Sequence, residues 1–105
     1  MEHESSIELT VVVPAWNEAA DIVATVSALR DALAELGRPS ELLVVDDASD
    51  DATARLAVNA GATVLSVEKR QIAAVRNAGA AATDGRLLIF VDADTIVPSE
   101  TLREL

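Results

Sequence analysis

Short apolar segments alternate along this chain with longer amphipathic ones. The apolar segments are largely continuous runs rich in Val, Leu and Ile, and they occupy residues 7–14, 41–47, 63–67 and 85–91. A continuous apolar run of this length predicts a strand that is buried on both faces of a parallel sheet. The sequence therefore predicts four parallel strands that alternate with helices.

The segment after the first strand carries an apolar stripe at helical spacing. Its apolar side chains recur at intervals of three and four residues, at Ile22, Val26, Leu29, Leu33 and Leu36. Such a stripe is typical of an amphipathic helix that packs on a core. We expect Asn17 to cap this helix and Glu18 to open its first turn. Gly37 and Pro39 are expected to end it.

Three further helical segments are predicted. Residues 49–62 open with the capping residues Ser49 and Asp50 and close at Gly61, and residues 71–83 form an Ala-rich segment. Residues 98–105 predict the start of another helix, with Ser99 as its cap. The order of elements is therefore β-α-β-α-β-α-β, with the beginning of a fourth helix.

The composition of the chain disfavours several classes of function. The 105 residues carry a formal net charge of −10, from 18 acidic and 8 basic side chains. Such a charge disfavours binding to nucleic acid or anionic lipid. The chain has no cysteine, no basic and apolar leader at its N-terminus, and no apolar run near the roughly 20 residues of a membrane span. No membrane contact is evident, and we expect a cytoplasmic protein.

Carboxylates gather at the ends of three of the four predicted strands. The acids that follow the first, second and fourth strands are Glu18, Asp46, Asp47, Asp92 and Asp94. The third strand ends instead in residues 67–70, which include Lys69 and Arg70. Because ligands of parallel sheets bind at the carboxyl ends of the strands, the five acids are expected to share one rim. Their oxygens suit Mg²⁺ or Mn²⁺, hard cations that also bind phosphate.

Each of these acids also has a structural interpretation. An Asp that follows a strand often caps a helix or forms a turn, and we expect that role for Asp50 and Asp51. Asp46, Asp92 and Asp94 could each serve the same purpose alone. The convergence of all five acids on one rim is therefore more informative than any one of them.

Three stretches of the chain resemble a known family. In order and at ordinary spacing, "VVVPAWNE", "LLVVDDASDDAT" and "AVRNAGAAATDGRLLIFVDAD" are similar to the N-terminal half of family 2 glycosyltransferases of the GT-A type, over residues 8–98. We expect a single α/β domain over residues 1–105. It should be a Rossmann-like three-layer sandwich whose parallel sheet has the strand order 3-2-1-4.

The resemblance implies a nucleoside pocket at the rim. Pro14, Ala15 and Glu18 would line it, with Glu18 near the ribose. Asp47 would accept a hydrogen bond from the base, and Asp46 would lie beside it. The implied ligand is a UDP-sugar or a GDP-sugar.

The resemblance also implies a site for the diphosphate. Asp92 and Asp94 would form the family's Asp-X-Asp motif, with Asp94 binding Mn²⁺ or Mg²⁺ and Asp92 near the ribose or the metal. Arg76 would face the nucleotide-sugar region. A bound cation would neutralise the diphosphate as the sugar departs.

Several features depart from the family pattern. Gln71 stands where glycine is common, Trp16 where tyrosine or leucine is more usual, and Thr95 where a third Asp is common. We expect Trp16 to be a packing residue or a plug of the loop rather than a binding platform. The family's second half, which supplies the acceptor site and usually the catalytic base, has no counterpart in these 105 residues. No catalytic residue is therefore assigned, and we expect the isolated chain to bind a donor without transferring sugar.

Other functions are also compatible with parts of this pattern. A non-catalytic nucleotide- or metal-binding module, or an inactive fragment, would present the same rim. A dinucleotide-binding oxidoreductase is disfavoured because no G-x-G-x-x-G follows the first strand. A phosphoacceptor signalling domain would need a lysine after a later strand, whereas Lys69 follows the third. We also expect a homodimer through an exposed fourth strand, since apolar strand edges promote pairing.

Overall fold

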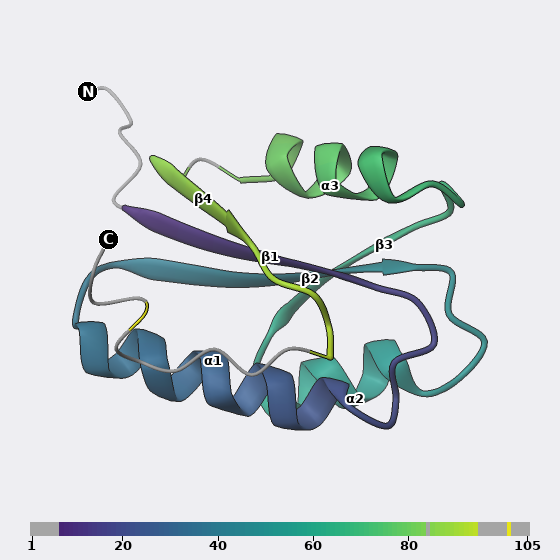
Figure 1. Ribbon diagram of the computed structural model, residues 1–105, viewed down its shortest axis with the longest axis horizontal. Helices are drawn as coiled ribbons and strands as arrows, with labels where there is room; N and C mark the ends of the chain where they lie inside the picture. The colour runs from purple at the N-terminus through teal and green to yellow at the C-terminus, as the bar shows by residue number, and fades with distance from the viewer. Residues whose placement is uncertain (1–6, 84, 95–100, 102–105) are drawn as a thin grey trace.

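A four-stranded parallel sheet forms the centre of the protein. The computed structural model describes residues 7–83, 85–94 and 101. Their elements are β1 (Leu9–Ala15), α1 (Ile22–Leu36), β2 (Ser40–Asp47), α2 (Thr53–Ala60), β3 (Thr63–Val67), α3 (Ile72–Ala81) and β4 (Leu87–Phe90) (Figure 1). The sheet has the order β3-β2-β1-β4, and each neighbouring pair is parallel. The predicted fold class and strand order are confirmed.

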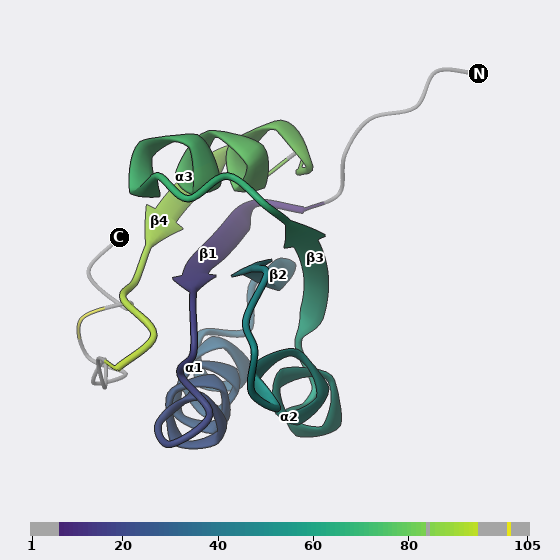
Figure 2. The same ribbon diagram turned by 90° about the vertical axis from the view of Figure 1, so that its right-hand side faces the viewer.

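Helices cover both faces of the sheet. Helices α1 and α2 lie on one face and α3 lies on the other, which gives three layers (Figure 2). All seven residues of β1 are buried. Because alternate residues of a strand point to opposite faces, Val11 and Val13 join the core under α1 and α2. Val12 joins the smaller core under α3, which also contains Val45 and Val75.

A glycine lets α3 approach the sheet closely. A Cβ atom placed on Gly79 would lie 2.5 Å from Cγ1 of Val12 and 3.0 Å from Cγ2 of Val45. The first distance is far below the usual van der Waals separation of carbon atoms. Gly79 thus lets the backbone of α3 pack directly against β1 and β2. This contact sets the distance between α3 and the sheet.

The first helix begins later than predicted. Asn17 has a φ of 52°, whereas a residue that caps a helix N-terminus has extended backbone angles. Asp21 occupies the capping position, and the carbonyl of Glu18 accepts a hydrogen bond from the amide of Ile22 at 2.8 Å. The prediction that Asn17 caps α1 is therefore wrong. Its side chain instead accepts a hydrogen bond from the amide of Asp50 at 2.8 Å.

The other boundaries are closer to those predicted. Helix α2 begins at Thr53 rather than at residue 49, because Ser49 and Asp50 belong to a loop that bonds to the loop after β1. Helices α1 and α2 end at Gly37 and Gly61, whose φ values of 72° and 107° suit glycine. The helix predicted over 98–105, including its expected cap Ser99, lies outside the described residues apart from residue 101.

Candidate functional site

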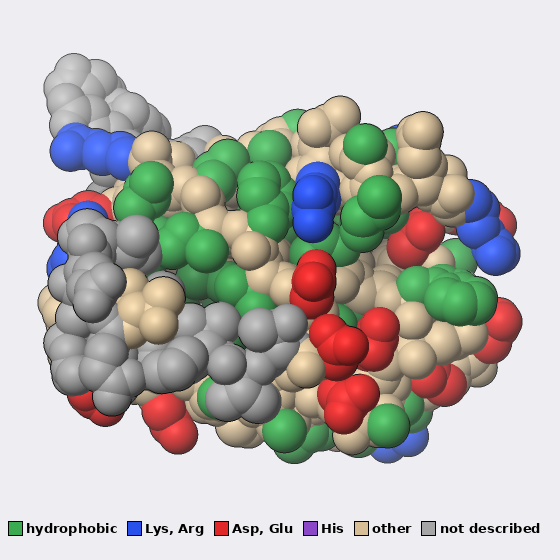
Figure 3. Space-filling view, viewed as in Figure 1, with side chains coloured by type: hydrophobic (Ala, Val, Ile, Leu, Met, Phe, Trp, Pro, Cys, Tyr) green, Lys and Arg blue, Asp and Glu red, His purple; other side chains and the backbone are tan. Residues whose placement is uncertain are grey.

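A cleft of about 600 Å³ opens where the strands end. Residues at or beyond the carboxyl ends of all four strands line it: Pro14, Ala15, Trp16, Glu18, Asp47, Arg70, Gln71, Ile72, Val75, Asp92, Ala93 and Asp94. Six of the eight residues predicted for the site are among them. The two others, Asp46 and Arg76, lie nearby. Acidic side chains gather visibly on the face of the molecule shown in Figure 3.

Like charges meet on one side of the cleft. The pKa of Glu18 is raised above its ordinary value, first by burial and then by the negative charge of Asp94, with smaller contributions from Asp21, Asp51 and Asp92. Since neighbouring carboxylates oppose each other's ionisation, a cation bound between them would be stabilised. This side of the cleft is suited to positive charge on a ligand or to a metal ion.

The metal-ligating capacity of the described residues is limited. In residues 7–83, 85–94 and 101, no group of three or more His, Cys, Asp or Glu side chains is arranged to hold a metal. Asp92 and Asp94 supply carboxylate oxygens at the cleft. One or two carboxylates completed by substrate phosphates is a common way for proteins to bind Mg²⁺. The donor set therefore fits a hard cation that is shared with a phosphate.

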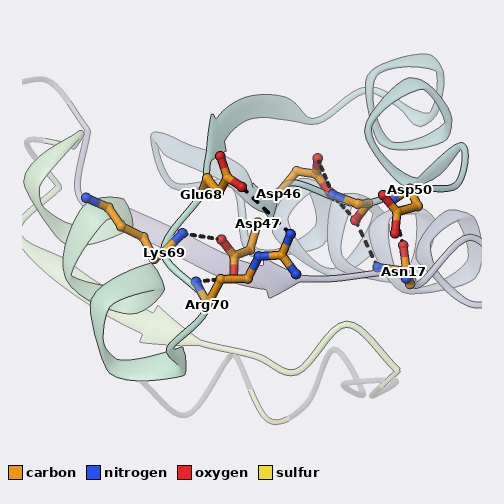
Figure 4. A network of polar contacts seen from close by, with 8 residues as sticks. Asn17, Asp46, Asp47, Asp50, Glu68, Lys69 and Arg70 are labelled. Carbon is orange, nitrogen blue, oxygen red and sulfur yellow. Dashed lines mark hydrogen bonds and ion pairs between the residues drawn. The ribbon is translucent and has the colours of Figure 1, made fainter.

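Asp47 joins β2 to the loop between β3 and α3 at the cleft. Its two carboxylate oxygens accept hydrogen bonds from the backbone amides of Lys69 at 2.6 Å and Arg70 at 3.0 Å (Figure 4). Each carboxylate oxygen has two lone pairs, so acceptor capacity remains for a ligand. The contact ties the end of β2 to the loop between β3 and α3, and that loop brings Arg70 to the cleft.

Arg70 is a cation that sequence analysis did not assign to the site. Its φ of 57° places it in the left-handed region, which a non-glycine residue adopts at some energetic cost. Its guanidinium lies 3.7 Å from Glu68, and both side chains are mainly exposed. Its position directly after a parallel strand was the available signal, because all four strands end at the same edge.

Arg76 borders the cleft without lining it. Its guanidinium lies 4.0 Å from a carboxylate oxygen of Asp92 and 5.7 Å from the centre of the Phe90 ring. An exposed ion pair of this length contributes little to stability. The arrangement does place a positive charge beside Asp92, the first Asp of the Asp-X-Asp sequence.

Asp46 faces away from the cleft. It is 5% exposed, and its two carboxylate oxygens accept hydrogen bonds from the hydroxyl of Ser49 at 2.5 Å and from the amide of Ser49 at 3.4 Å. Neighbouring residues of a strand point to opposite faces, so Asp46 and Asp47 do not share an environment. Only Asp47 of this pair lines the cleft.

Two further residues shape the site from outside the predicted set. The buried hydroxyl of Thr25, on α1, donates a hydrogen bond of 2.6 Å to the carbonyl of Ala93. This contact secures the turn between Asp92 and Asp94. Trp16 is 50% exposed and lines the cleft, so it is not packed into the interior.

The chain belongs to a known family. Residues 10–105 match glycosyl transferase family 2. The succinoglycan biosynthesis protein ExoO of Rhizobium meliloti (strain 1021) is 35% identical over 102 residues, which cover 93% of this chain and 28% of that protein. The family resemblance seen in the sequence motifs is confirmed.

Solved structures show the same fold. Glucosyl-3-phosphoglycerate synthase of Mycobacterium tuberculosis superposes with a TM-score of 0.74 at 30% identity, over 86% of this chain and 35% of that one. Mannosyltransferase PcManGT of Pyrobaculum calidifontis, solved with GDP-Man and Mn²⁺, superposes with a TM-score of 0.77 at 29% identity, over 91% and 30%. The fold is that of the N-terminal half of a GT-A glycosyltransferase. The chain spans 28% to 35% of the length of these three proteins.

Proposed function

We propose that this domain binds the nucleoside-diphosphate sugar of a glycosyl transfer reaction, with a divalent cation at Asp92 and Asp94. The observation that carries the proposal is the convergence of carboxylates from the ends of three different strands on one cleft, which Arg70 also lines. A nucleotide sugar presents a base, a ribose and a diphosphate. Each part meets a suitable group in this cleft.

The nucleoside would lie between the β1 and β2 ends. Pro14 and Ala15 contribute apolar surface to the cleft, and Asp47, which also lines it, has acceptor capacity for an N–H of the base. Glu18 would accept a hydrogen bond from a ribose hydroxyl. Asp46 does not line the cleft, so its contribution to nucleotide binding is indirect.

The diphosphate would lie toward the end of β4. Asp94 and Asp92 would hold Mn²⁺ or Mg²⁺, and Arg76 pairs with Asp92 from its exposed side. The cation would supply charge neutralisation for the departing nucleoside diphosphate. Arg70 contributes a second positive charge to the cleft.

The ligand class is supported by the similar structures. The M. tuberculosis synthase has been solved with Mn²⁺, UDP-glucose and phosphoglyceric acid, and PcManGT with GDP-Man and Mn²⁺. We therefore propose a UDP-sugar or GDP-sugar as the donor. Transfer to an acceptor would need residues beyond those described.

Among the described residues, no helix is both long and apolar enough to cross a membrane, and the cytoplasmic location stays a prediction.

A non-catalytic nucleotide- or metal-binding module is the alternative. The same cleft would bind the same ligands in both cases, and the two functions differ only in whether sugar is transferred. We expect the isolated chain to bind a donor nucleotide in a titration and to show no turnover in a transfer assay. Measurable turnover would contradict the expectation that a second half supplies the acceptor site and the base.

Calorimetric titration tests the proposal. The ligands are UDP, GDP, UDP-glucose and GDP-mannose, each with and without Mn²⁺. We expect at least one nucleotide to bind more tightly with Mn²⁺, and Asp94→Ala to abolish that gain. Asp47→Ala should weaken binding under both conditions, because its proposed partner is the base.

A matched control removes the same charge elsewhere. Asp31 is exposed on α1 and lies outside the cleft, so Asp31→Ala should leave nucleotide affinity and the Mn²⁺ effect unchanged. A Mn²⁺ effect that survives Asp94→Ala would rule out the proposed cation site. Absence of binding to any of the four nucleotides would rule out the proposed function.

A further inference from the structure

The loop after β1 is held by side chains of the loop after β2. The backbone amide of Asn17 donates to the hydroxyl oxygen of Ser49 at 2.8 Å. That hydroxyl donates in turn to a carboxylate oxygen of Asp46 at 2.5 Å. The carboxylate therefore orients the hydroxyl so that a lone pair faces the amide. The result is a chain of two hydrogen bonds from Asp46 to the backbone of Asn17.

The next residue of the loop is held in the same way. The amide of Glu18 donates to the hydroxyl oxygen of Thr53 at 2.8 Å, and that hydroxyl donates to Asp51. The second carboxylate oxygen of Asp51 accepts the amide of Ala19 at 3.2 Å. Three consecutive amides thus bind one neighbouring loop, and in two of these contacts a carboxylate acts through a hydroxyl.

The residues in these chains lie behind the cleft. Asp46, Ser49, Asp51 and Thr53 do not line it, whereas Trp16 and Glu18 do. Thr53 and Asp46 are buried. Asn17 adopts a φ of 52°, and its side chain accepts the amide of Asp50, so the two loops bond in both directions (Figure 4). The contacts fix backbone that would otherwise be free to move beside the ligand.

We propose that Asp46 and Asp51 are positioning residues that act through Ser49 and Thr53 to hold Trp16 and Glu18 in the orientation that receives the nucleotide. This inference rests on the proposed function of the cleft. A loop that is ordered before the ligand arrives removes the entropic cost of ordering it on binding. It also keeps Glu18 in place against the repulsion of Asp94 and Asp92.

The ionisation of the Asp51 carboxyl group agrees with this role. The pKa of its carboxyl is held below the ordinary value, chiefly by the hydroxyl hydrogen bond from Thr53 and further by the backbone hydrogen bonds from Thr53 and Ala19. A carboxylate that accepts several hydrogen bonds is favoured in its charged form. Asp51 is thus ionised at neutral pH and keeps the Thr53 hydroxyl oriented.

The test combines amide hydrogen exchange with nucleotide titration in the 105-residue chain. Thr53→Val keeps the shape of the side chain and removes its hydroxyl. We expect faster exchange at the amide of Glu18 and about a tenfold loss of affinity for UDP or GDP, whichever the wild-type protein binds, as for one lost hydrogen bond. Thr53→Ser, which keeps the hydroxyl, should restore both.

A matched control repeats the substitution at the other end of the sheet. The hydroxyl of Thr83 donates to Glu41 at 2.8 Å and lies 2.7 Å from the hydroxyl of Thr10. Thr83→Val removes a hydroxyl bound to a carboxylate, far from the cleft. It is expected to lower stability without changing nucleotide affinity. Equal losses of affinity in Thr53→Val and Thr83→Val would overturn the positioning role.

A double-mutant cycle tests whether Asp46 acts through Ser49. If it does, Asp46→Ala combined with Ser49→Ala should weaken nucleotide binding about as much as either change alone. Fully additive losses would show that Asp46 does not act through Ser49 and would overturn the inference.

Amide exchange separates this inference from the proposed function. Unchanged exchange at Asn17 and Glu18 in the variants would refute the hydrogen-bond chains, whatever the affinity. Faster exchange with unchanged affinity would refute the positioning role alone. A wild-type protein that binds no nucleotide would refute both the proposed function and this use of the loop.

Discussion

The turn that carries the Asp-X-Asp sequence depends on a single buried hydroxyl of α1. Thr25 is 1% exposed, and its hydroxyl donates to the carbonyl of Ala93 at 2.6 Å. Thr25→Val preserves shape and replaces this donor with a methyl group. The carbonyl then loses a buried partner, which costs about 1–3 kcal/mol.

The gain from the new methyl group is smaller. Burying one additional methyl or methylene group contributes about 0.8 kcal/mol, and Thr and Val have similar helix propensities. We therefore expect a net loss of about 0.2–2 kcal/mol in the free energy of unfolding. For a domain of this size, each kcal/mol lowers the thermal midpoint by roughly 4–8 °C.

The assay for Thr25→Val is urea denaturation followed by nucleotide titration with Mn²⁺. Thr25→Ser is the matched control, because it keeps the donor and loses only a methyl group. We expect Thr25→Val to reduce the Mn²⁺-dependent gain in affinity, since the carbonyl lies between Asp92 and Asp94, and Thr25→Ser to retain it. Unchanged stability and an unchanged Mn²⁺ effect in Thr25→Val would show that this hydrogen bond does not position the turn.

Three more predictions concern charge, packing and association. Burial and the nearby carboxylates raise the pKa of Glu18, so its ionised form is less stable in the folded chain than in the unfolded chain. Glu18→Gln should therefore raise the urea midpoint near pH 7, and this gain should vanish below about pH 4, where glutamate is protonated in both states; a gain that persists there would contradict the assignment. Gly79→Ala should lower the free energy of unfolding by about 1–3 kcal/mol despite its better helix propensity, because the new Cβ would overlap Val12; an unchanged urea midpoint would show that α3 shifts freely. Strand β4 is an edge of the described sheet, and Leu87 and Phe90 on it are 39% and 40% exposed. We expect self-association through β4 that strengthens as salt screens the net charge, which light scattering over a salt series would contradict if the protein stayed monomeric throughout.

The strands could be predicted from sequence because each of them is a short, largely apolar run. The central strands β1 and β2 are mostly buried, whereas the edge strands β3 and β4 are only partly buried. The acids that follow three of these runs mark the edge where ligands bind. The helix starts were harder to predict. Asn17 and Ser49 look like caps, but each forms hydrogen bonds with the other's loop, 32 residues away in sequence. Partners this distant leave no periodic signal.

The site could be located from sequence, but not every residue in it. Asp46 and Asp47 are adjacent in the chain and point to opposite sides of a strand, and the sequence does not say which of them faces the cleft. Arg70 follows Glu68 and Lys69 after β3, and a search for converging acids passes over a basic residue. Thr25 is on the buried side of a helix, where its partner Ala93 is 68 residues away. These assignments need the three-dimensional contacts.

Paramagnetic broadening by Mn²⁺ tests the proposed site most directly. In an amide spectrum of the 105-residue chain, we expect Mn²⁺ added with UDP or GDP to broaden the signals of Asp92, Ala93, Asp94 and Glu18. The signals of Gly37 and Thr83, at the other end of the sheet, should remain sharp. Broadening at that end instead, or equally over the whole chain, would contradict a cation and nucleotide site at the carboxyl ends of the strands.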